Sequence, residues 1–407
     1  MNRRNFIKSS GSAAVVTGLA GCGGILGGGG SSETVTIGLQ ADLTGSFANI
    51  GFWHERITEA YVEQLQESDD FDHDIELAVA DTATDSSQGV QAMRDLIQQD
   101  GADVVIGSQN SGVAIGSTSV AQETDTPYVS IAQAPSITGE DGNRWVLRHA
   151  EDVAQYAHVS VGYGVENLSE RWTILYQDYA FGQQFNAALQ ELLPKAGAEV
   201  LDSISVQLGQ TDLTSQLNSV PEETEVLFAA VVPPTSLSFL GQSAENDTPG
   251  QRFGPIQSVE TVDVSEIGQP AEGARFVSPM PRRLEERDTE GHQQLLELGN
   301  VDEPDTPRLS HMVWSYEAVS LVADALDNTD WPSAGNEVFV EWIESGPSFG
   351  TGADYPQGSK FYRGADHQVF PPIYLEQVAN GELRRRDTYS MEEPPYSPRV
   401  DFTDQSF

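Results

Sequence analysis

Short apolar segments alternate with amphipathic segments of helical period along most of this chain, and this alternation constrains the fold more than any other feature. The first four apolar segments span residues 35–39, 75–80, 104–106 and 127–131. The stretches between the first three carry apolar residues at helical spacing, for example Trp53, Ile57, Tyr61 and Leu65. Strands and helices of these lengths in alternation predict parallel sheets with helices on both faces.

The same alternation starts again after Asp152. Apolar segments 172–176, 200–206 and 226–231 are separated by amphipathic stretches, and a long helix is expected around residues 313–326. The chain is also too long for one ordinary hydrophobic core. The sequence therefore predicts an α/β fold with two doubly wound lobes.

The N-terminus has the features of an export signal. Arg3 and Arg4 precede an apolar run, residues 13–21, that is too short to span the roughly 30 Å of a bilayer core. The pair resembles a twin-arginine signal, and residues 19–22 resemble a lipobox ending in Cys22, the only cysteine in the chain. We expect residues 1–22 to be the signal, Cys22 to carry lipid, residues 23–33 to be a Gly/Ser tether, and the protein to be held on the extracellular face of the membrane.

Charge excludes one class of partner. The chain has 62 acidic and 21 basic residues, for a formal net charge of −41, so it would repel nucleic acid. Lysine occurs only at positions 8, 195 and 360, and acidic or small polar residues occupy the positions that lysine usually takes. This composition is typical of halophilic proteins, and we expect cooperative structure to be lost in dilute buffer, where self-repulsion is unscreened.

Five segments in order resemble the type I periplasmic binding proteins of branched-chain amino acid ABC transporters. They are residues 37–48, residues 104–112, residues 174–182, the pair Gly254-Pro255 and the pair Glu272-Gly273. The resemblance implies a small-molecule solute and an ABC permease as partners. It also implies a three-strand hinge, expected near residues 148–150, near residues 276–279 and after Trp342, with lobe 1 formed by 34–148 plus 278–334 and lobe 2 by 149–277 plus 335–407.

The ligand should bind at the carboxyl ends of the strands, where open parallel sheets place their binding loops. The candidate ligand-binding residues on these loops are Phe47, Gln109, Asn110, Ser111, Ala132, Gln133, Ala134, Phe181, Val232, Pro233 and Glu260. Ser111 would open a helix whose N-terminus favours a carboxylate or another polar oxygen, which is the role that the family gives the matching serine; alternatively it only caps the helix. Phe181 stands where the family usually has tyrosine and could press on a bound ligand, or be an ordinary core residue.

Two departures from the family pattern concern the ligand's ammonium group. Ala134 replaces a threonine, although the carbonyl of Ala132 would be available either way, and Ile256 follows Gly254-Pro255 where the family has an acidic residue. Glu260 is the nearest acidic candidate. Either Glu260 reaches the site, or the ligand is not a standard α-amino acid, because a buried ammonium without a carboxylate partner is costly.

Catalytic and metal-binding patterns are weak. Residues 162–164 are a fragment of a dinucleotide turn in helical sequence, the seven histidines lack close metal-ligand spacing, and no serine occupies a nucleophile elbow. We expect no enzyme activity, no cofactor and no metal. The predicted function is delivery of a branched-chain or related amino acid to an ABC importer, with urea, short amides, organic acids or a sensory receptor role as alternatives.

Overall fold

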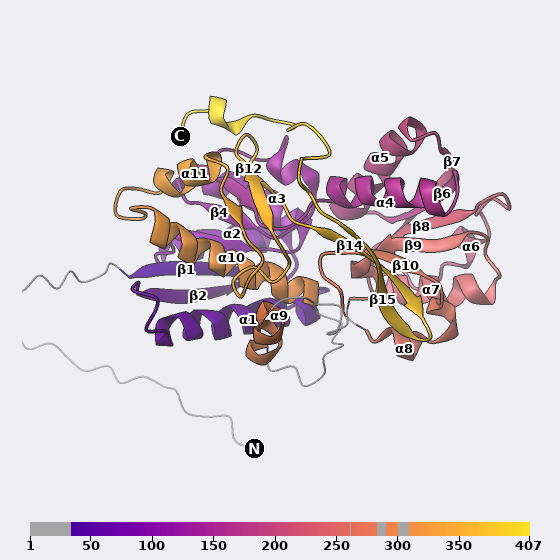
Figure 1. Ribbon diagram of the computed structural model, residues 1–407, viewed down its shortest axis with the longest axis horizontal. Coiled ribbons are helices and arrows are strands. Elements are labelled where there is room, and N and C mark those ends of the chain that lie inside the picture. Colours follow the sequence, from indigo (N-terminus) through magenta and orange to yellow (C-terminus); the bar gives the residue numbers. More distant parts are fainter. Residues whose placement is uncertain (1–33, 261, 283–289, 300–308) are drawn as a thin grey trace, which may run out of the picture. The chain divides into compact units, whose positions relative to one another are not determined.

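The computed structural model describes residues 34–260, 262–282, 290–299 and 309–407. The predicted export signal, the tether and Cys22 lie outside these residues. Residues Glu33–Phe407 form one compact unit, which contains two sheets (Figure 1). Among the described residues, no helix combines the length and the apolar character needed to cross a membrane.

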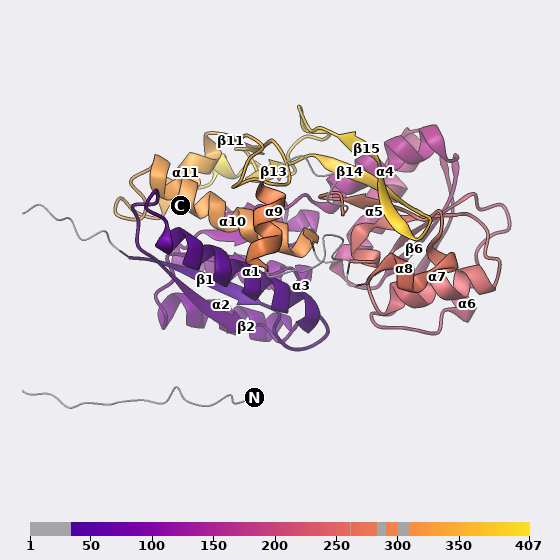
Figure 2. The ribbon, with the colours of Figure 1, turned by 60° about the horizontal axis from the view of Figure 1, so that its bottom comes forward.

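The first sheet has eight strands. Their order across the sheet is β11 (Ser348–Phe349), β12 (Lys360–Arg363), β13 (Gln368–Phe370), β5 (Val146–Arg148), β4 (Tyr128–Ser130), β3 (Val104–Gly107), β1 (Val35–Ala41) and β2 (Ile75–Asp81). The strands from β13 to β2 are parallel, whereas β11 and β12 are antiparallel additions at one edge. The long expected helix is α10 (Leu309–Asn328), which packs beside α1 (Ala48–Glu67) and α9 (Glu290–Leu298), as Figure 2 shows.

The second sheet has seven strands. Their order is β15 (Glu382–Tyr389), β14 (Ile373–Ala379), β10 (Arg275–Ser278), β9 (Gln251–Pro255), β8 (Val226–Ala230), β6 (Arg171–Gln177) and β7 (Glu199–Val206). The five strands from β10 to β7 are parallel, whereas β14 pairs antiparallel with β10 and forms an antiparallel hairpin with β15. Helices α4 (Val153–Asn167) and α5 (Ala180–Lys195) lie on one face, and α6 (Thr214–Leu217), α7 (Thr235–Glu245) and α8 (Val264–Ile267) lie on the other (Figure 1).

Each sheet separates two apolar cores, because side chains alternate along a strand. Val104 and Ile106 of β3 face the core that α1 and α10 cover. Val105, between them, faces the core that α2 (Ser86–Gln98) and α3 (Ser111–Thr124) cover. The side chains of β8 alternate between two cores in the same way. Because both faces of such strands are buried, their sequences are continuous apolar runs.

The predicted assignment of residues 335–407 to the second lobe is wrong in part. Helix α11 (Glu337–Glu344) packs on the first core, and β11, β12 and β13 complete the first sheet. The neighbouring strands β13 and β14 belong to different sheets. Pro371 and Pro372 separate them, because proline has no backbone N–H to donate to a ladder.

The chain passes between the sheets after β5 and after β10, close to the hinge segments expected at residues 148–150 and 276–279. The third passage lies between β13 and β14, later in the chain than the crossing expected after Trp342. A fourth passage follows β15, because the C-terminal segment returns to the first sheet. There the backbone N–H of Phe402 donates to the carbonyl of Ala365, and the ring of Phe407 packs 5.0 Å from that of Trp145. This C-terminal return was not predicted.

Candidate functional site

A cavity of about 240 Å³ lies where loops from the carboxyl ends of strands in both sheets meet. Its apolar lining residues are Phe47, Ile50, Tyr179, Phe181, Val232, Pro233, Pro234 and Leu237. Its polar lining residues are Ser46, Asn49, Gln109, Ser111, Gln133 and Gln257. We call this cavity the cleft.

The β1–α1 loop brings Phe47 to the cleft. Asp81, at the end of the neighbouring strand β2, accepts hydrogen bonds from the backbone N–H groups of Leu43 and Thr44 at 2.9 and 3.1 Å and from the Thr44 hydroxyl at 2.6 Å. Burial acts to raise the pKa of Asp81, but these hydrogen bonds outweigh it and lower that pKa. Phe47 itself donates its backbone N–H to the Thr84 hydroxyl at 3.2 Å. The loop is therefore held from β2 and its connection to α2.

The β3–α3 loop presents Ser111. The Asn110 side chain caps α3 by accepting from the N–H groups of Gly112 and Val113 at 2.9 and 3.2 Å. Ser111, which is buried and lines the cleft, is thus not the capping residue. Below this loop, Ser108 donates to the buried carboxyl of Asp42 at 2.9 Å, and burial raises the pKa of Asp42.

Aromatic side chains form the second sheet's side of the cleft. The rings of Tyr179 and Phe181 stack 5.9 Å apart, and Phe181 meets Phe185 edge to face at 5.4 Å. Phe47, although carried by the first sheet's loop, packs in the same apolar cluster as Phe181. This packing brings the two sides together at one margin of the cleft.

Gln133 connects the cleft to a buried carboxyl group. Its side-chain amide donates to Glu151 at 3.1 Å, and Glu151 also accepts from Tyr156 at 2.6 Å, from Trp314 at 3.2 Å and from Gln357 at 3.0 Å. Burial raises the pKa of Glu151, and the hydrogen bonds oppose that effect. These bonds fix the orientation of Gln133.

Gln257 follows β9 and is only 4% exposed. Within the part of the chain that the structure describes, no hydrogen bond of ordinary geometry satisfies its side-chain oxygen or nitrogen. Its amide nevertheless lies close enough to the Tyr156 hydroxyl for a weak hydrogen bond that acts to lower the pKa of that hydroxyl. Because a buried amide without partners costs free energy, this side chain is suited to a ligand that supplies them.

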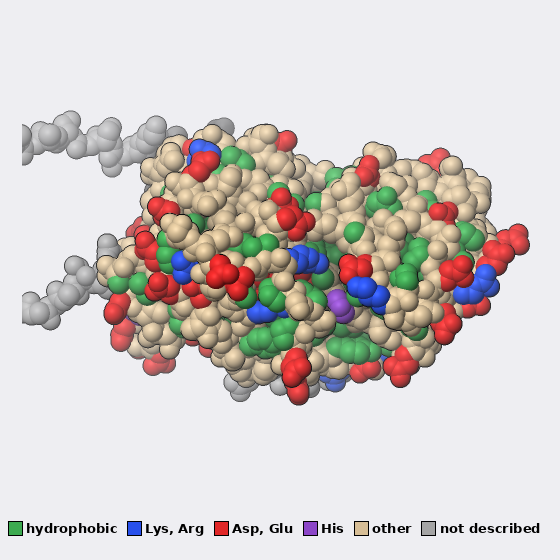
Figure 3. Space-filling model, turned by 90° about the horizontal axis from the view of Figure 1, so that it is seen from above, with side chains coloured by type: hydrophobic (Ala, Val, Ile, Leu, Met, Phe, Trp, Pro, Cys, Tyr) green, Lys and Arg blue, Asp and Glu red, His purple; other side chains and the backbone are tan. Residues whose placement is uncertain are grey.

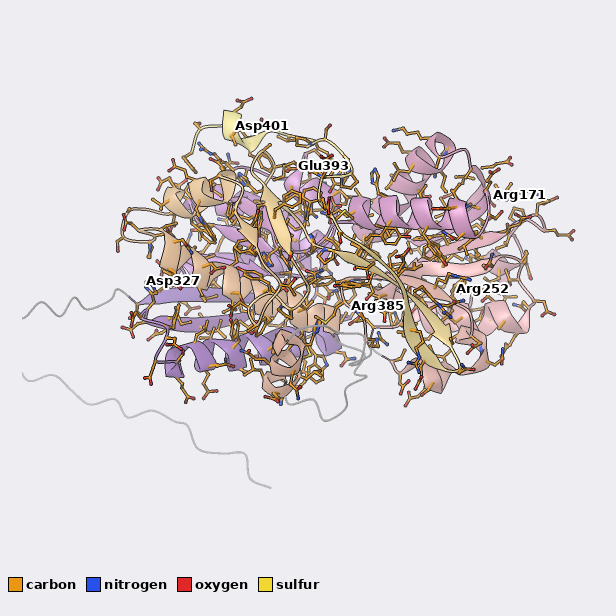
Figure 4. The ribbon with its side chains drawn as sticks, viewed as in Figure 1. Arg171, Arg252, Asp327, Arg385, Glu393 and Asp401 are labelled. Atoms are coloured by element: carbon orange, nitrogen blue, oxygen red, sulfur yellow. The ribbon has the colours of Figure 1, made fainter. Side chains whose placement is uncertain are left out.

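The charged side chains that the structure describes lie outside the lining of the cleft. On the face in Figure 3, acidic side chains are spread over the surface and basic ones are few. Figure 4 labels Arg171 and Arg252, which belong to the amino-terminal ends of β6 and β9, whereas the cleft lies at the carboxyl ends of these strands. Within the described residues, no charged side chain lines the cleft.

Seven of the predicted ligand-binding residues line the cleft: Phe47, Gln109, Ser111, Gln133, Phe181, Val232 and Pro233. The other four lie outside the lining. They are Asn110, Ala132, Ala134 and Glu260.

The structure gives these four residues other roles. Asn110 is the cap of α3, and the carbonyls of Ala132 and Ala134 accept from the buried guanidinium of Arg148 at 3.3 and 2.5 Å. Glu260 lies 3.8 Å from the guanidinium of Arg282. Ala132 and Glu260, the predicted partners of a ligand's ammonium group, are therefore engaged within the protein.

The lining also includes residues that the prediction omitted. Ser46, Tyr179, Pro234 and Gln257 lie on loops that were expected to form the site. Asn49, Ile50 and Leu237 lie in the first turns of α1 and α7, and the general rule that helix N-termini face the ligand could have found them.

Two hydrogen bonds between residues outside the lining also join the two sides of the cleft. The backbone N–H of Ser136, in η1 (Pro135–Thr138), donates to the side-chain oxygen of Gln184 on α5 at 3.2 Å. The Gln184 amide donates in return to the Ser136 hydroxyl at 3.0 Å. We call this pair the clasp.

A two-sheet α/β fold with a cavity between the carboxyl ends of both sheets defines a solute-binding class of protein. The chain belongs to the Periplasmic binding protein family, whose sequence pattern matches residues 34–382. The chain is 20% identical over 316 residues to Leu/Ile/Val-binding protein homolog 7 of Brucella melitensis, covering 73% of this chain and 78% of that protein.

Solved structures share the fold. A solute-binding protein from Rhodopseudomonas palustris in complex with 3,4-dihydroxybenzoic acid has a TM-score of 0.75 at 20% identity, covering 89% of this chain and 99% of the other. The branched-chain amino acid binding protein of Streptococcus pneumoniae in complex with isoleucine has a TM-score of 0.71 at 16% identity, covering 87% and 100%. At these identities the likeness shows the fold alone.

Proposed function

We propose that this protein is the extracellular, lipid-anchored solute-binding component of an ABC importer. It captures a small polar solute in the cleft and delivers it to the permease. The observation that carries this proposal is the cleft itself, which both sheets line at the carboxyl ends of their strands. A ligand that contacts both sides stabilises the closed arrangement, and only such differential contact can drive closure.

A thermal-shift panel in molar potassium chloride tests the binding function. It covers branched-chain and other amino acids, urea, short amides and organic acids, which include the kinds of ligand that the sequence left open. We expect at least one solute to raise the melting temperature without being chemically changed. No shift from any solute, or turnover of the one that binds, would overturn the proposal.

The anchor is tested separately in cells that express the full chain. The proposal expects the protein in the membrane fraction and its Cys22→Ser variant in the medium or unprocessed. The matched Arg3→Lys/Arg4→Lys variant is expected to stay inside the cell, because the twin-arginine pair directs export. Release of the wild-type protein into the medium would contradict the anchor and leave the binding function standing.

A further inference from the structure

The cleft is built without charge. Six of its residues are serines or carry side-chain amides, and the other side chains are apolar apart from the hydroxyl of Tyr179. An α-amino acid carries both a carboxylate and an ammonium group. The carboxylate can be held by hydrogen-bond donors, but an ammonium buried without an acidic partner is costly.

The acidic residues of the first sheet's loops are held away from such a role. Asp42 is buried beneath the β3–α3 loop against Thr82 and Ser108, and Asp81 holds the backbone of the β1–α1 loop. Glu151 already accepts four hydrogen bonds, one of them from Gln133, and does not itself line the cleft.

The acidic residues of the second sheet's loops are engaged as well. Asp178 accepts from the side-chain amide of Gln183 at 2.8 Å, and Glu260 faces Arg282. Neither carboxylate lines the cleft. Gln257, three residues before Glu260, does line the cleft, and its side chain is a buried amide.

A carboxyl or carboxamide group on the ligand would match the amide side chains that line the cleft. The unpartnered amide of Gln257 can donate to a carbonyl oxygen, and the buried oxygen of Gln109, also without a partner among the described residues, can accept from an amide or acid proton. The stacked rings of Tyr179 and Phe181 with Leu237 offer an apolar surface for the ligand's body.

From this arrangement we infer that the ligand is a small carboxylic acid or carboxamide with an apolar or aromatic body and no ammonium group. The inference rests on the proposed function and gives its ligand class. A cleft that selects such a ligand would not select α-amino acids.

Matched compounds test the ligand class directly. Isocaproate differs from leucine, and hydrocinnamate from phenylalanine, chiefly by lacking the ammonium. Isothermal titration calorimetry in molar potassium chloride should show isocaproate or hydrocinnamate, or the corresponding amide, binding at least about 10- to 100-fold more tightly than its amino acid. Equal or tighter binding of the amino acid overturns the inference while leaving the proposed function intact.

If none of the matched compounds binds, the inference on ligand class is also overturned. The proposed function falls only if the broader thermal-shift panel gives no shift either. The two failures are therefore distinguishable.

A variant of Gln257 provides a second test. Gln257→Glu places an acid in the cleft, and we expect the ratio of leucine to isocaproate affinity to rise by about 10-fold or more. Gln190→Glu, at an exposed position of α5, makes the same change in net charge and should leave the ratio unchanged. Should Gln257→Glu not fold, Gln257→Met is expected to weaken isocaproate and its amide by about 10-fold. An unchanged ratio in folded Gln257→Glu, or unchanged affinity in Gln257→Met, overturns the role of Gln257.

Discussion

Replacing Lys360 with methionine should destabilise the protein far more than the same change at Lys195. Lys360 is fully buried on β12, where its ammonium pairs with the equally buried carboxylate of Glu317 and donates to the side-chain oxygen of Gln357 at 2.8 Å. Burial acts to lower the pKa of Lys360, and Glu317 opposes that effect. Lys195 instead pairs with Glu191 at 2.6 Å on the surface of α5, and both side chains are about two-thirds exposed.

The magnitudes follow from burial. Removing one partner of a buried pair leaves the other charge uncompensated, which typically costs about 3–5 kcal/mol of unfolding free energy. Glu317 would keep the backbone N–H of Gln357, at 2.8 Å, so the lower end of that range is expected for Lys360→Met. Lys195→Met should cost about 0.3–0.5 kcal/mol, as for other exposed pairs one helical turn apart.

Urea unfolding followed by circular dichroism, in molar potassium chloride, measures both variants. The double variant Lys360→Met/Glu317→Gln should recover part of the loss, because neither charge is then buried alone. If Lys360→Met costs no more than Lys195→Met, or if the double variant is less stable than Lys360→Met, the reasoning from the buried pair is refuted.

Three further predictions concern the cleft and pH. Phe181→Ala should weaken the tightest ligand of the panel by about 1–3 kcal/mol in calorimetry, because its ring lines the cleft; unchanged affinity would place the ligand elsewhere. Gln184→Leu removes the clasp to Ser136 and should weaken ligand binding by about 5- to 100-fold, although Gln184 does not line the cleft. Gln190→Leu, at an exposed position of the same helix, should have no effect, and equal effects of the two variants would remove the clasp from the closure mechanism. Burial lowers the pKa of His54 from 6.5 to about 3, so the unfolded state binds a proton first and unfolding free energy should fall by about 1.4 kcal/mol per pH unit as pH drops below 6.5. His54→Leu should remove this contribution in pH-dependent urea melts, while the contribution of His149, whose pKa burial lowers to about 4, should remain. An identical slope in the variant and the wild type would contradict the prediction.

The sequence was informative about the fold where one strand alternated with one helix. Apolar segments such as residues 35–39 and 226–231 are strands β1 and β8, because buried parallel strands need residues that pack on both faces. It was less informative beyond α10. There the strands are short, antiparallel and joined by proline-containing segments, so residues 348–370 could not be assigned to a sheet from their pattern.

The cleft was predictable to the level of loops and less so to the level of side chains. The rule that ligands bind at strand carboxyl ends places Ser111 and Phe181 at the cleft. The engagement of Glu260 with Arg282 was not predictable, because the two are distant in sequence and meet only when the chain folds. The unpartnered amide of Gln257 was likewise not apparent from sequence, since lack of a partner is a property of the folded surroundings.

A cleft without charge is consistent with the salt that the composition predicts. At molar salt the Debye length is about 3 Å, so attraction between a solvated ligand charge and a protein charge is largely screened. Hydrogen bonds from Gln257 and contacts with Phe181 do not depend on that attraction. The charges that the fold keeps for structure, Lys360 and Glu317, are fully buried, and buried pairs are screened much less. Recognition by neutral donors and apolar surface would therefore keep its strength in the same solvent that screens repulsion among the 62 acidic residues.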